Sequence, residues 1–395
     1  MSTLTRTVLA ILVVILGALV VLPFVLSLIG IDLFSFGGAG GGGFFGGSNQ
    51  SILISFDAKE WVNADFVREK TVEPPTNFLD IAFHPQHEGI FFLGTQKNGL
   101  WKSIDAGKTW QKQTDQKGAL LPASDVYRIA GAPSNPQIIY LATFQNNRGR
   151  VLKSEDGGDS FREIYFVSAD RFGVFDIFVD TFNAEHVLIV TGQGGLLETD
   201  DGGFSWHVRH WFGEALTRLM VNPNNTNEIY VVSQSGRFSK TKDGGKTWTN
   251  ALEGFTRQSR AANTQSTNQF TTPQSPLMFD FSGFGAGTVT YFMPDRYIFS
   301  TVYMIRNGNV WRTVNGGEAW EQIQIIVPPN ASMVSAFAAY PGRSNPLFAA
   351  VGNQLYRSDD GGREWSFSIL PTSGKAVRLL IPGGSLDIML AIVQK

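Results

Sequence analysis

The chain has 395 residues, and its 34 acidic and 32 basic side chains give a formal net charge of −2. This balance argues against a nucleic-acid partner, because proteins that bind a phosphate backbone usually carry a clear basic excess. The absence of cysteine excludes disulfide scaffolds, thiol nucleophiles and thiolate zinc sites. The fold must therefore depend on its apolar core, for which this length and a hydrophobic content of 43% are sufficient.

The N-terminal region carries a long apolar segment. Between Arg6 and Asp32 lie 25 residues without a charge, and roughly 20 apolar residues are enough to span a bilayer core. No small-residue cleavage pattern accompanies the segment, so we expect residues 7–31 to form an uncleaved transmembrane anchor. The alternative is a buried core helix, which would need an apolar partner helix that the sequence does not supply.

The charges around the apolar segment predict its orientation. Arg6 precedes it, and the next basic residue after it is Lys59. The positive-inside rule then places residues 1–6 in the cytoplasm and the globular part outside the membrane, in the periplasm or at the cell surface. Residues 32–50 include the run GGAGGGGFFGG, which is typical of a flexible linker.

An eight-residue pattern, Ser/Thr-x-Asp-x-Gly-x-Thr/Ser-aromatic, occurs six times after the linker. The copies are SIDAGKTW, SEDGGDSF, TDDGGFSW, TKDGGKTW, TVNGGEAW and SDDGGREW. Their third positions are Asp105, Asp156, Asp201, Asp243, Asn315 and Asp360. A period of 40–50 residues with strand-like runs between the copies predicts the blades of a β-propeller.

Each copy is expected to form a tight turn between two strands. The Asp accepts hydrogen bonds from backbone N–H groups that follow it, and the Gly two positions later supplies a positive φ. The pattern resembles the Asp-box, or BNR repeat, of sialidases, sortilin-type receptor domains and the photosystem II stability/assembly factor family. This resemblance implies a propeller in which the boxes are structural and lie away from the binding face.

The ends of the repeat region predict seven blades. Two strand-like runs follow the last box, and SILISFDAKEW supplies two more around a degenerate seventh box at Asp57. Together they make one four-stranded blade, whose formation closes the ring and protects its edges. We therefore expect an all-β, seven-bladed propeller over residues 51–395, with a seam blade built from both termini. A longer loop is expected at about 251–287, where the box spacing rises to 72 residues.

Counting back from the boxes aligns one polar residue on each expected innermost strand. These residues are Asp80, Arg128, Asp176, Arg218, Thr290, Ser335 and Arg378. Innermost strands line the central channel of a propeller, so the seven residues are predicted to form a polar ring. In one interpretation neighbouring charges pair and stabilise the channel, and in the other the ring binds a ligand or partner.

The face opposite the Asp-boxes is a second candidate for binding. The links between an outer strand and the next inner strand fall there, as does the loop at 251–287. Aromatic residues in or beside these links are Phe166, Phe172, Trp211, Phe212 and Phe255. We expect a protein partner at this face.

Enzymatic function is not expected. The run YRIA around Arg128 resembles the Phe/Tyr-Arg-Ile-Pro motif of sialidases but lacks its proline. A glycosidase needs two carboxylates about 5–10 Å apart, whereas a whole blade separates Asp80 from Asp176. No phosphate-binding loop, nucleophile elbow or dinucleotide fingerprint occurs in a suitable context.

No metal or cofactor site is predicted either, because His84 and His87 in HPQH are expected to lie in a solvated turn. The chain is therefore expected to be a non-enzymatic protein-binding or complex-assembly module, similar to the photosystem II assembly factor and sortilin-type domains. A sialidase-like or other exo-glycosidase outside the cytoplasm is the alternative.

Overall fold

All the regular structure that can be described in this chain is β-sheet. The computed structural model describes residues 50–67, 73–252, 289–295, 298–327, 333–340, 342, 345–382 and 388–395. The strands in these ranges form seven sheets, and none of the ranges contains a helix that could cross a membrane. The expected anchor at 7–31 lies outside the described residues, as do residues 1–6 and all of the linker except Gln50.

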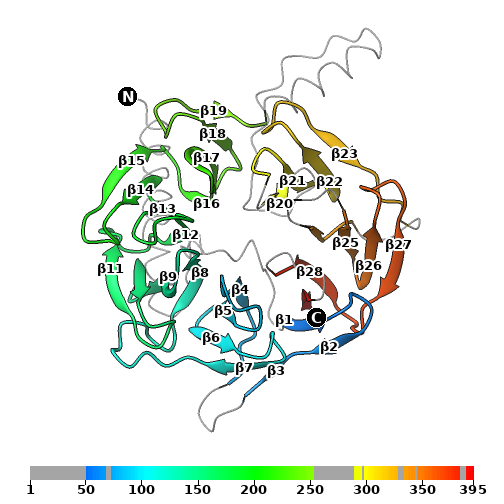
Figure 1. The fold of residues 1–395 in the computed structure, drawn as a ribbon, viewed down its shortest axis with the longest axis horizontal. Helices are drawn as coiled ribbons and strands as arrows, with labels where there is room; N and C mark the ends of the chain where they lie inside the picture. The colour runs from blue at the N-terminus through cyan, green and yellow to red at the C-terminus, as the bar shows by residue number, and fades with distance from the viewer. Residues whose placement is uncertain are drawn as a thin grey trace, which may run out of the picture. The chain divides into compact units, whose positions relative to one another are not determined.

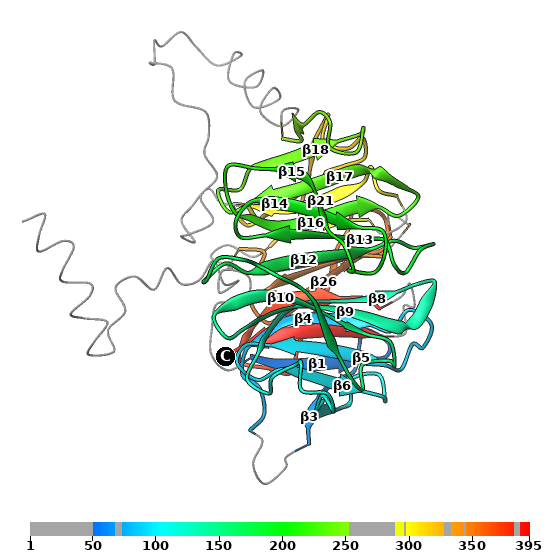
Figure 2. The same ribbon diagram turned by 90° about the vertical axis from the view of Figure 1, so that its left-hand side faces the viewer.

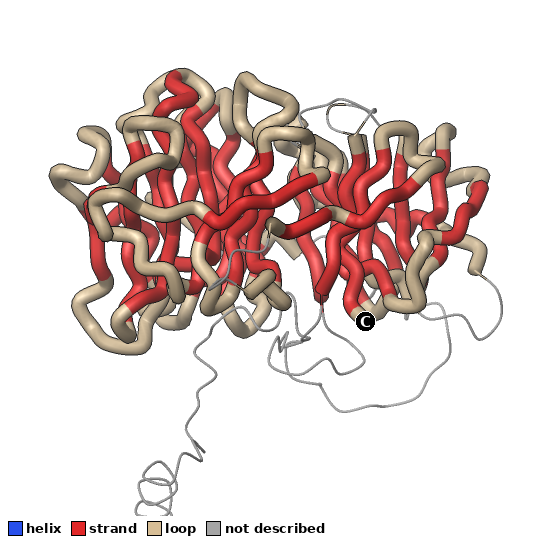
Figure 3. Tube along the Cα trace, turned by 90° about the horizontal axis from the view of Figure 1, so that it is seen from below, coloured by secondary structure: helices blue, strands red, loops and turns tan. Residues whose placement is uncertain are grey.

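The seven sheets are the blades of a propeller (Figure 1). In blades 2 to 6 the first strand in the chain lies nearest the axis of the ring and the last at the circumference. Figure 2 shows the ring from its side, and Figure 3 shows strands joined only by loops and turns within the described chain. The predicted all-β, seven-bladed architecture is confirmed.

Blades 1 to 3 follow one another along the chain and are given from the innermost strand outward. Blade 1 contains β4 (Phe78–Phe83), β5 (Phe91–Thr95), β6 (Leu100–Ser103) and β7 (Thr109–Lys112). Blade 2 contains β8 (Asp125–Ala132), β9 (Asn135–Gln145), β10 (Arg148–Ser154) and β11 (Arg162–Phe166). Blade 3 contains β12 (Val174–Val179), β13 (Val187–Thr191), β14 (Gly195–Thr199) and β15 (His207–Trp211).

Blades 4 to 6 repeat this plan. Blade 4 contains β16 (Leu216–Asn222), β17 (Asn225–Ser233), β18 (Phe238–Thr241) and β19 (Thr249–Asn250). Blade 5 contains β20 (Val289–Pro294), β21 (Val302–Arg306), β22 (Asn309–Thr313) and β23 (Glu321–Ile323). Blade 6 contains β24 (Ala336–Ala339), β25 (Leu347–Val351), β26 (Gln354–Ser358) and β27 (Ser366–Ile369).

The seam blade has the composition that the sequence predicts. From the axis outward it contains β28 (Lys375–Leu380), β29 (Met389–Gln394), β1 (Gln50–Ser55) and β2 (Trp61–Asn63). β1 and β29 are antiparallel and pair along the whole of β1. One further strand was not predicted: β3 (Asp65–Phe66) pairs in parallel with β7 as the fifth strand of blade 1. The N-terminal segment therefore connects the seam blade to the outside of its neighbour.

Separate apolar cores fill the seven interfaces between adjacent blades of the described chain. Between blades 1 and 2, for example, Phe92 packs with Val126. In the seam blade, Ile52 and Ile54 face blade 1 while Leu53 faces blade 6. Successive residues of a strand point to opposite faces of its sheet, so β1 contributes to two cores. This is how a pair of terminal strands completes both interfaces of the seam.

The Asp-box turns have the predicted hydrogen bonds. In the first box the backbone N–H and the hydroxyl of Thr109 donate to the carboxylate of Asp105 at 2.8 and 2.7 Å. The N–H of Gly107 donates to the Ser103 hydroxyl at 2.8 Å, and Gly107 has a φ of +88°. The residues that recur among the copies of the Asp-box are therefore those whose hydrogen bonds and backbone conformation close the turn.

The box at Asn315 and the degenerate box at Asp57 depart from the pattern at or beside the acceptor and still form the turn. The amide oxygen of Asn315 accepts the Ala319 N–H at 2.9 Å. In the degenerate box of the seam blade, the Asp57 carboxylate accepts the N–H groups of Lys59 and Glu60 at 2.7 and 2.8 Å. An acceptor oxygen at the third position is therefore the common requirement.

These turns should make the fold sensitive to acid. The hydroxyls of Thr241 and Thr247 donate to Asp243 and hold its pKa below the usual value. For Asp156, burial raises the pKa, but hydrogen bonds led by those from Ser160 outweigh it and lower the pKa to about 2. A carboxyl with a lowered folded-state pKa stabilises the fold above its unfolded pKa, and that stability is lost as the pH falls through the folded value. We expect the urea midpoint to fall between about pH 4 and pH 2.

A variant with Asp156→Asn and Asp243→Asn provides the comparison for this experiment. Asn315 shows that a carboxamide can hold the same turn, so the variant should fold while lacking two of the titrating groups. Its urea midpoint should change less steeply over the same pH range. Identical pH slopes for the two proteins would contradict the assignment of acid sensitivity to these turns.

Candidate functional site

Five charged side chains from neighbouring blades form a continuous arrangement around the axis, which we call the charged ring. From the seam blade to blade 4 its members are Arg378, Asp80, Arg128, Asp176 and Arg218. Their charges alternate in sign from one blade to the next. Each residue is the third or fourth residue of its innermost strand, and these strands begin at the end farther from the Asp-box turns.

Arg128 connects the two acids of the charged ring. Its Nε lies 2.9 Å from Oδ1 of Asp176, and its Nη1 lies 3.4 Å from Oδ1 of Asp80. The Nη2 of Arg378 lies 3.5 Å from the same Asp80 oxygen. Both aspartates are only 2% exposed. Arg128 therefore joins acids on the two blades that flank its own.

Both carboxylates also accept a backbone hydrogen bond from the next blade. The N–H of Ile129 donates to Oδ2 of Asp80 at 2.9 Å, and that of Leu219 donates to Oδ2 of Asp176 at 3.0 Å. Buried carboxylates require such partners, because an unpaired buried charge is strongly destabilising. The two acids thus tie adjacent blades together, and their oxygens are occupied by donors.

A β-bulge explains why the ring side chains share one orientation. In the innermost strands of these five blades the pairing register skips one residue immediately before the ring position. The skipped residues are Leu79, Tyr127, Phe175, Thr217 and Val377. A bulge re-aims the following side chain and increases the local twist.

The register corrects the predicted place of Thr290. In β20 the skip lies between Val289 and Tyr291, so Thr290 occupies the bulge and Tyr291 occupies the ring position. The side chains of all three residues lie outside the described part of the chain. Tyr291 lies 24 residues before Asn315, whereas the ring residues of blades 1, 3 and 4 lie 25 residues before their box residues, so the count is one residue in error here.

Ser335 also lies one residue before the ring position of its blade. Its hydroxyl donates to the carbonyl of Ala350, which pairs with Ala336. In blade 4 the hydroxyl of Thr217 makes the corresponding bond to the residue that pairs with Arg218. Ala336 therefore occupies the ring position. Ser335 instead joins blade 6 to the seam blade, because its hydroxyl also donates to the carbonyl of Ala376 at 2.5 Å.

The charged ring carries an excess of positive charge, since it has three arginines and two aspartates. Burial lowers the pKa of the Arg218 guanidinium, the charge of Asp176 opposes this effect, and Arg128 and Arg378 reinforce it. Chemically, the ring can hold blades together through its ion pairs and can attract an anionic group through its net charge.

The face opposite the Asp-boxes exposes aromatic side chains. β11 and β15 each begin after an Asp-box turn and therefore end at this face. Phe166 ends β11 and is 49% exposed, Trp211 ends β15 and is 54% exposed, and Phe172 in the link to β12 is 41% exposed. We call these three residues the aromatic rim.

The other aromatic residues predicted for this face, Phe212 and Phe255, and the loop at 251–287 are not part of the aromatic rim. Phe212 packs against Trp248, with ring centroids 4.9 Å apart, and so belongs largely to the core between blades 3 and 4. Phe255 lies outside the described residues, as does the 251–287 loop beyond Ala251 and Leu252.

Arginines lie on the same face as the aromatic rim. Arg148 follows the turn between β9 and β10 and pairs with Asp170. Arg237, in the turn between β17 and β18, pairs with Glu214 at 3.3 Å and has a side chain that is 66% exposed. Exposed aromatic and arginine side chains together are typical of protein–protein interfaces.

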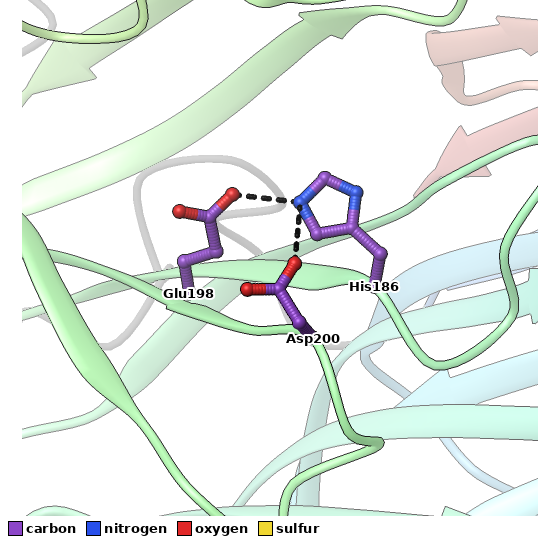
Figure 4. Close-up of side chains that lie close together, drawn as sticks. All are labelled: His186, Glu198 and Asp200. Carbon is purple, nitrogen blue, oxygen red and sulfur yellow. Dashed lines mark hydrogen bonds and ion pairs between the residues drawn. The ribbon is translucent and has the colours of Figure 1, made fainter.

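A second charged cluster, which was not predicted from the sequence, lies in blade 3. Nε2 of His186 lies 2.7 Å from Glu198 Oε1 (Figure 4), and Nε2 of His207 lies 2.9 Å from the other Glu198 oxygen. Arg209 Nε approaches Glu198 at 3.1 Å. The hydrogen bond to Glu198 raises the pKa of His186, against the effect of burial. A detectable signal was the Glu in GLLET, a strand that is otherwise apolar apart from its terminal Thr.

The HPQH segment forms a turn, as expected. Nδ1 of His84 accepts the backbone N–H groups of Gln86 and His87 at 3.2 and 3.1 Å. This ring nitrogen therefore supports the turn.

Comparison with known proteins agrees with this architecture. Residues 167–254, which include all of blades 3 and 4, match the family described as photosynthesis system II assembly factor YCF48. The chain resembles this family. The expected resemblance to sortilin-type domains stays a prediction.

Solved structures show the same fold. YCF48 bound to D1 peptide has a TM-score of 0.57 at 17% identity, over 82% of this chain and 95% of that one. YCF48 from Cyanidioschyzon merolae has a TM-score of 0.55 at 14% identity, over 81% and 97% of the two chains. The GH74 xyloglucanase from Xanthomonas campestris has a TM-score of 0.59 at 16% identity, over 82% of this chain and 52% of the enzyme.

One curated relative is an enzyme. The oligoxyloglucan-reducing end-specific xyloglucanase of Emericella nidulans is 26% identical over 160 residues, which cover 32% of this chain and 18% of the enzyme. The chain thus spans about half of one xyloglucanase and less than a fifth of the other. Since the similar proteins include both assembly factors and glycosidases, the expected absence of enzymatic activity stays a prediction.

Proposed function

We propose that this chain is a membrane-anchored, extracytoplasmic propeller that binds a protein partner and acts as an assembly module. The observation that carries the proposal is the aromatic rim, in which Phe166, Phe172 and Trp211 expose large apolar surfaces on neighbouring blades. Aromatic and arginine side chains supply most of the binding energy in typical interfaces. The anchor at 7–31 comes from the sequence alone and would hold this binding face close to membrane proteins.

The comparisons support a protein ligand. The match to the YCF48 family covers residues 167–254, which include Phe172 and Trp211. One similar solved structure is a YCF48 bound to a D1 peptide. The charged ring adds a net positive charge at the axis of the propeller, which would favour an acidic group of a partner.

A glycosidase outside the cytoplasm is the second candidate, because the similar proteins include xyloglucanases. Such an enzyme needs two carboxylates about 5–10 Å apart, one of them with a raised pKa. In the charged ring, Asp80 and Asp176 are both paired with Arg128 and both accept backbone N–H groups. Structural contacts thus occupy both carboxylates, which favours the binding function.

The test compares two aromatic faces of the same protein. The tagged chain is crosslinked in membranes of its own host after an alkaline carbonate wash, in which an anchored chain is retained. Phe172→Ala with Trp211→Ala should reduce recovery of the crosslinked partner about tenfold or more. Phe204→Ala is the matched control, because Phe204 is 83% exposed but lies in an Asp-box turn on the other face.

Equal recovery with the wild type and the double variant would contradict the proposal. Loss of the chain in the carbonate wash would contradict the anchor alone. Hydrolysis of xyloglucan oligosaccharides by the purified wild type would instead favour the second candidate.

A further inference from the structure

Four side chains with metal-binding groups meet at the Asp-box end of blade 3. They are His186, Glu198, Asp200 and His207, and we call them the blade 3 cluster. His186 immediately precedes β13, Glu198 is near the end of β14, Asp200 lies in the Asp-box turn and His207 begins β15. Adjacent antiparallel strands begin and end at the same edge, so the hairpins bring these residues together. The cluster is separate from the charged ring and the aromatic rim.

The donor atoms of three members of the cluster lie within the range that one ion can bridge, and the fourth member, His207, contacts Glu198. The ligand atoms of His186, Glu198 and Asp200 are all within 4.8 Å of one another (Figure 4). Nε2 of His186 is 2.7 Å from Glu198 and 3.8 Å from Oδ1 of Asp200. The second oxygen of Glu198 is 2.9 Å from Nε2 of His207. Glu198 therefore lies between two imidazoles, both of which present Nε2.

The imidazole of His186 is oriented for metal binding. Its Nδ1 lies 2.9 Å from Oδ2 of Asp180, and both side chains are largely buried. Nε2 is hydrogen-bonded to Glu198 in the ion-free chain, so an ion would displace the proton on Nε2 while Asp180 retains the one on Nδ1. Histidine ligands in metal sites characteristically have such a carboxylate behind them.

The charges of the cluster favour a cation. Asp180, Glu198 and Asp200 are acidic, and Arg209 supplies the permanent positive charge paired with them in the described chain. Imidazoles are neutral when they bind a metal ion, so two negative charges would remain for the ion to balance. One divalent cation would balance them, and it would replace the several hydrogen-bonded contacts of Glu198 with direct ligation.

We propose that His186, Glu198, Asp200 and His207 bind one divalent transition-metal ion, with Zn²⁺ preferred. Imidazole and carboxylate ligands are both common in zinc sites, and four protein ligands are typical of a structural rather than a catalytic site. The ion would join three strands of blade 3 at the edge where its Asp-box turn lies. This site does not depend on the proposed partner-binding function.

The test titrates Zn²⁺ into the whole chain after chelator treatment, using isothermal calorimetry near neutral pH. We expect one binding site and a rise in melting temperature on Zn²⁺ addition. Asp200→Asn and His207→Ala should each weaken binding at least about tenfold. Their side chains are 71% and 55% exposed, so the apo variants should keep the wild-type melting temperature. His87→Ala, an exposed imidazole outside the cluster, should bind like the wild type.

Three results would overturn the proposal. The first is a wild-type chain without measurable Zn²⁺ binding. The second is equal affinity in the wild type and in His207→Ala, which would place any bound ion elsewhere. The third is tighter binding of Mg²⁺ or Ca²⁺ than of Zn²⁺, because those ions prefer oxygen ligands alone.

Discussion

Arg128→Glu should lower the free energy of unfolding by about 3 kcal/mol, the lower end of the range for a broken buried ion pair. The substitution removes the cation shared by Asp80 and Asp176 and places a third acid between them. We take the lower end because the Arg128 side chain is 35% exposed. Urea denaturation followed by circular dichroism measures the change.

Arg148→Glu is the matched control for this experiment. Arg148 pairs with Asp170 at the surface, where both partners are at least one-third exposed, and such pairs contribute about 0–1 kcal/mol. If Arg128→Glu cost no more than Arg148→Glu, the charged ring would not be a structural element. If the Arg128 variant then also failed to recover the crosslinked partner, the ring would be a binding site instead.

Removal of residues 1–66 should be far more damaging than removal of residues 1–49. The longer truncation deletes β1 and with it Ile52, Leu53 and Ile54, which are at most 1% exposed. Burial of each such side chain contributes about 1.5–3 kcal/mol. The truncation also leaves β29 as an unpaired edge, which favours aggregation. Thermal melting and size-exclusion chromatography of the two proteins compare the outcomes.

The shorter truncation is the control, because it leaves every described strand in place. It should melt at the temperature of the whole propeller, whereas the longer one should aggregate or lack a cooperative transition. Equal melting temperatures would show that β1 is dispensable and that the ring closes without the seam pairing.

The sequence reveals the features of this fold that are local or periodic. An Asp-box needs only eight adjacent residues, so the turns at Asp105 and its equivalents could be predicted, and their spacing located the innermost strands. Features that depend on pairing between strands could not be found in this way. Tyr291 rather than Thr290 follows the register skip in β20, and the parallel pairing of Asp65 with Thr109 has no periodic signal.

The blade 3 cluster shows the same limit at a site. Glu198 and His207 are nine residues apart in sequence but are direct partners in the ladder between β14 and β15. His186, which immediately precedes β13, contacts the same Glu198. The three residues come together only because of the pairing registers of β13 with β14 and of β14 with β15. The charged ring was easier to predict because its members occupy one repeated position of the blade.

The pairing of β1 with β29 also sets the order of events during synthesis. The 333 residues 56–388 separate the two strands, and a ribosome adds about 5–20 residues each second. β1 therefore leaves the ribosome tens of seconds before its permanent neighbour exists. During that interval β2 is the only neighbour in its sheet with which β1 can pair. The ring can close only after translation of β29, so the completed circle is a late product of a protein whose other six blades can assemble in turn.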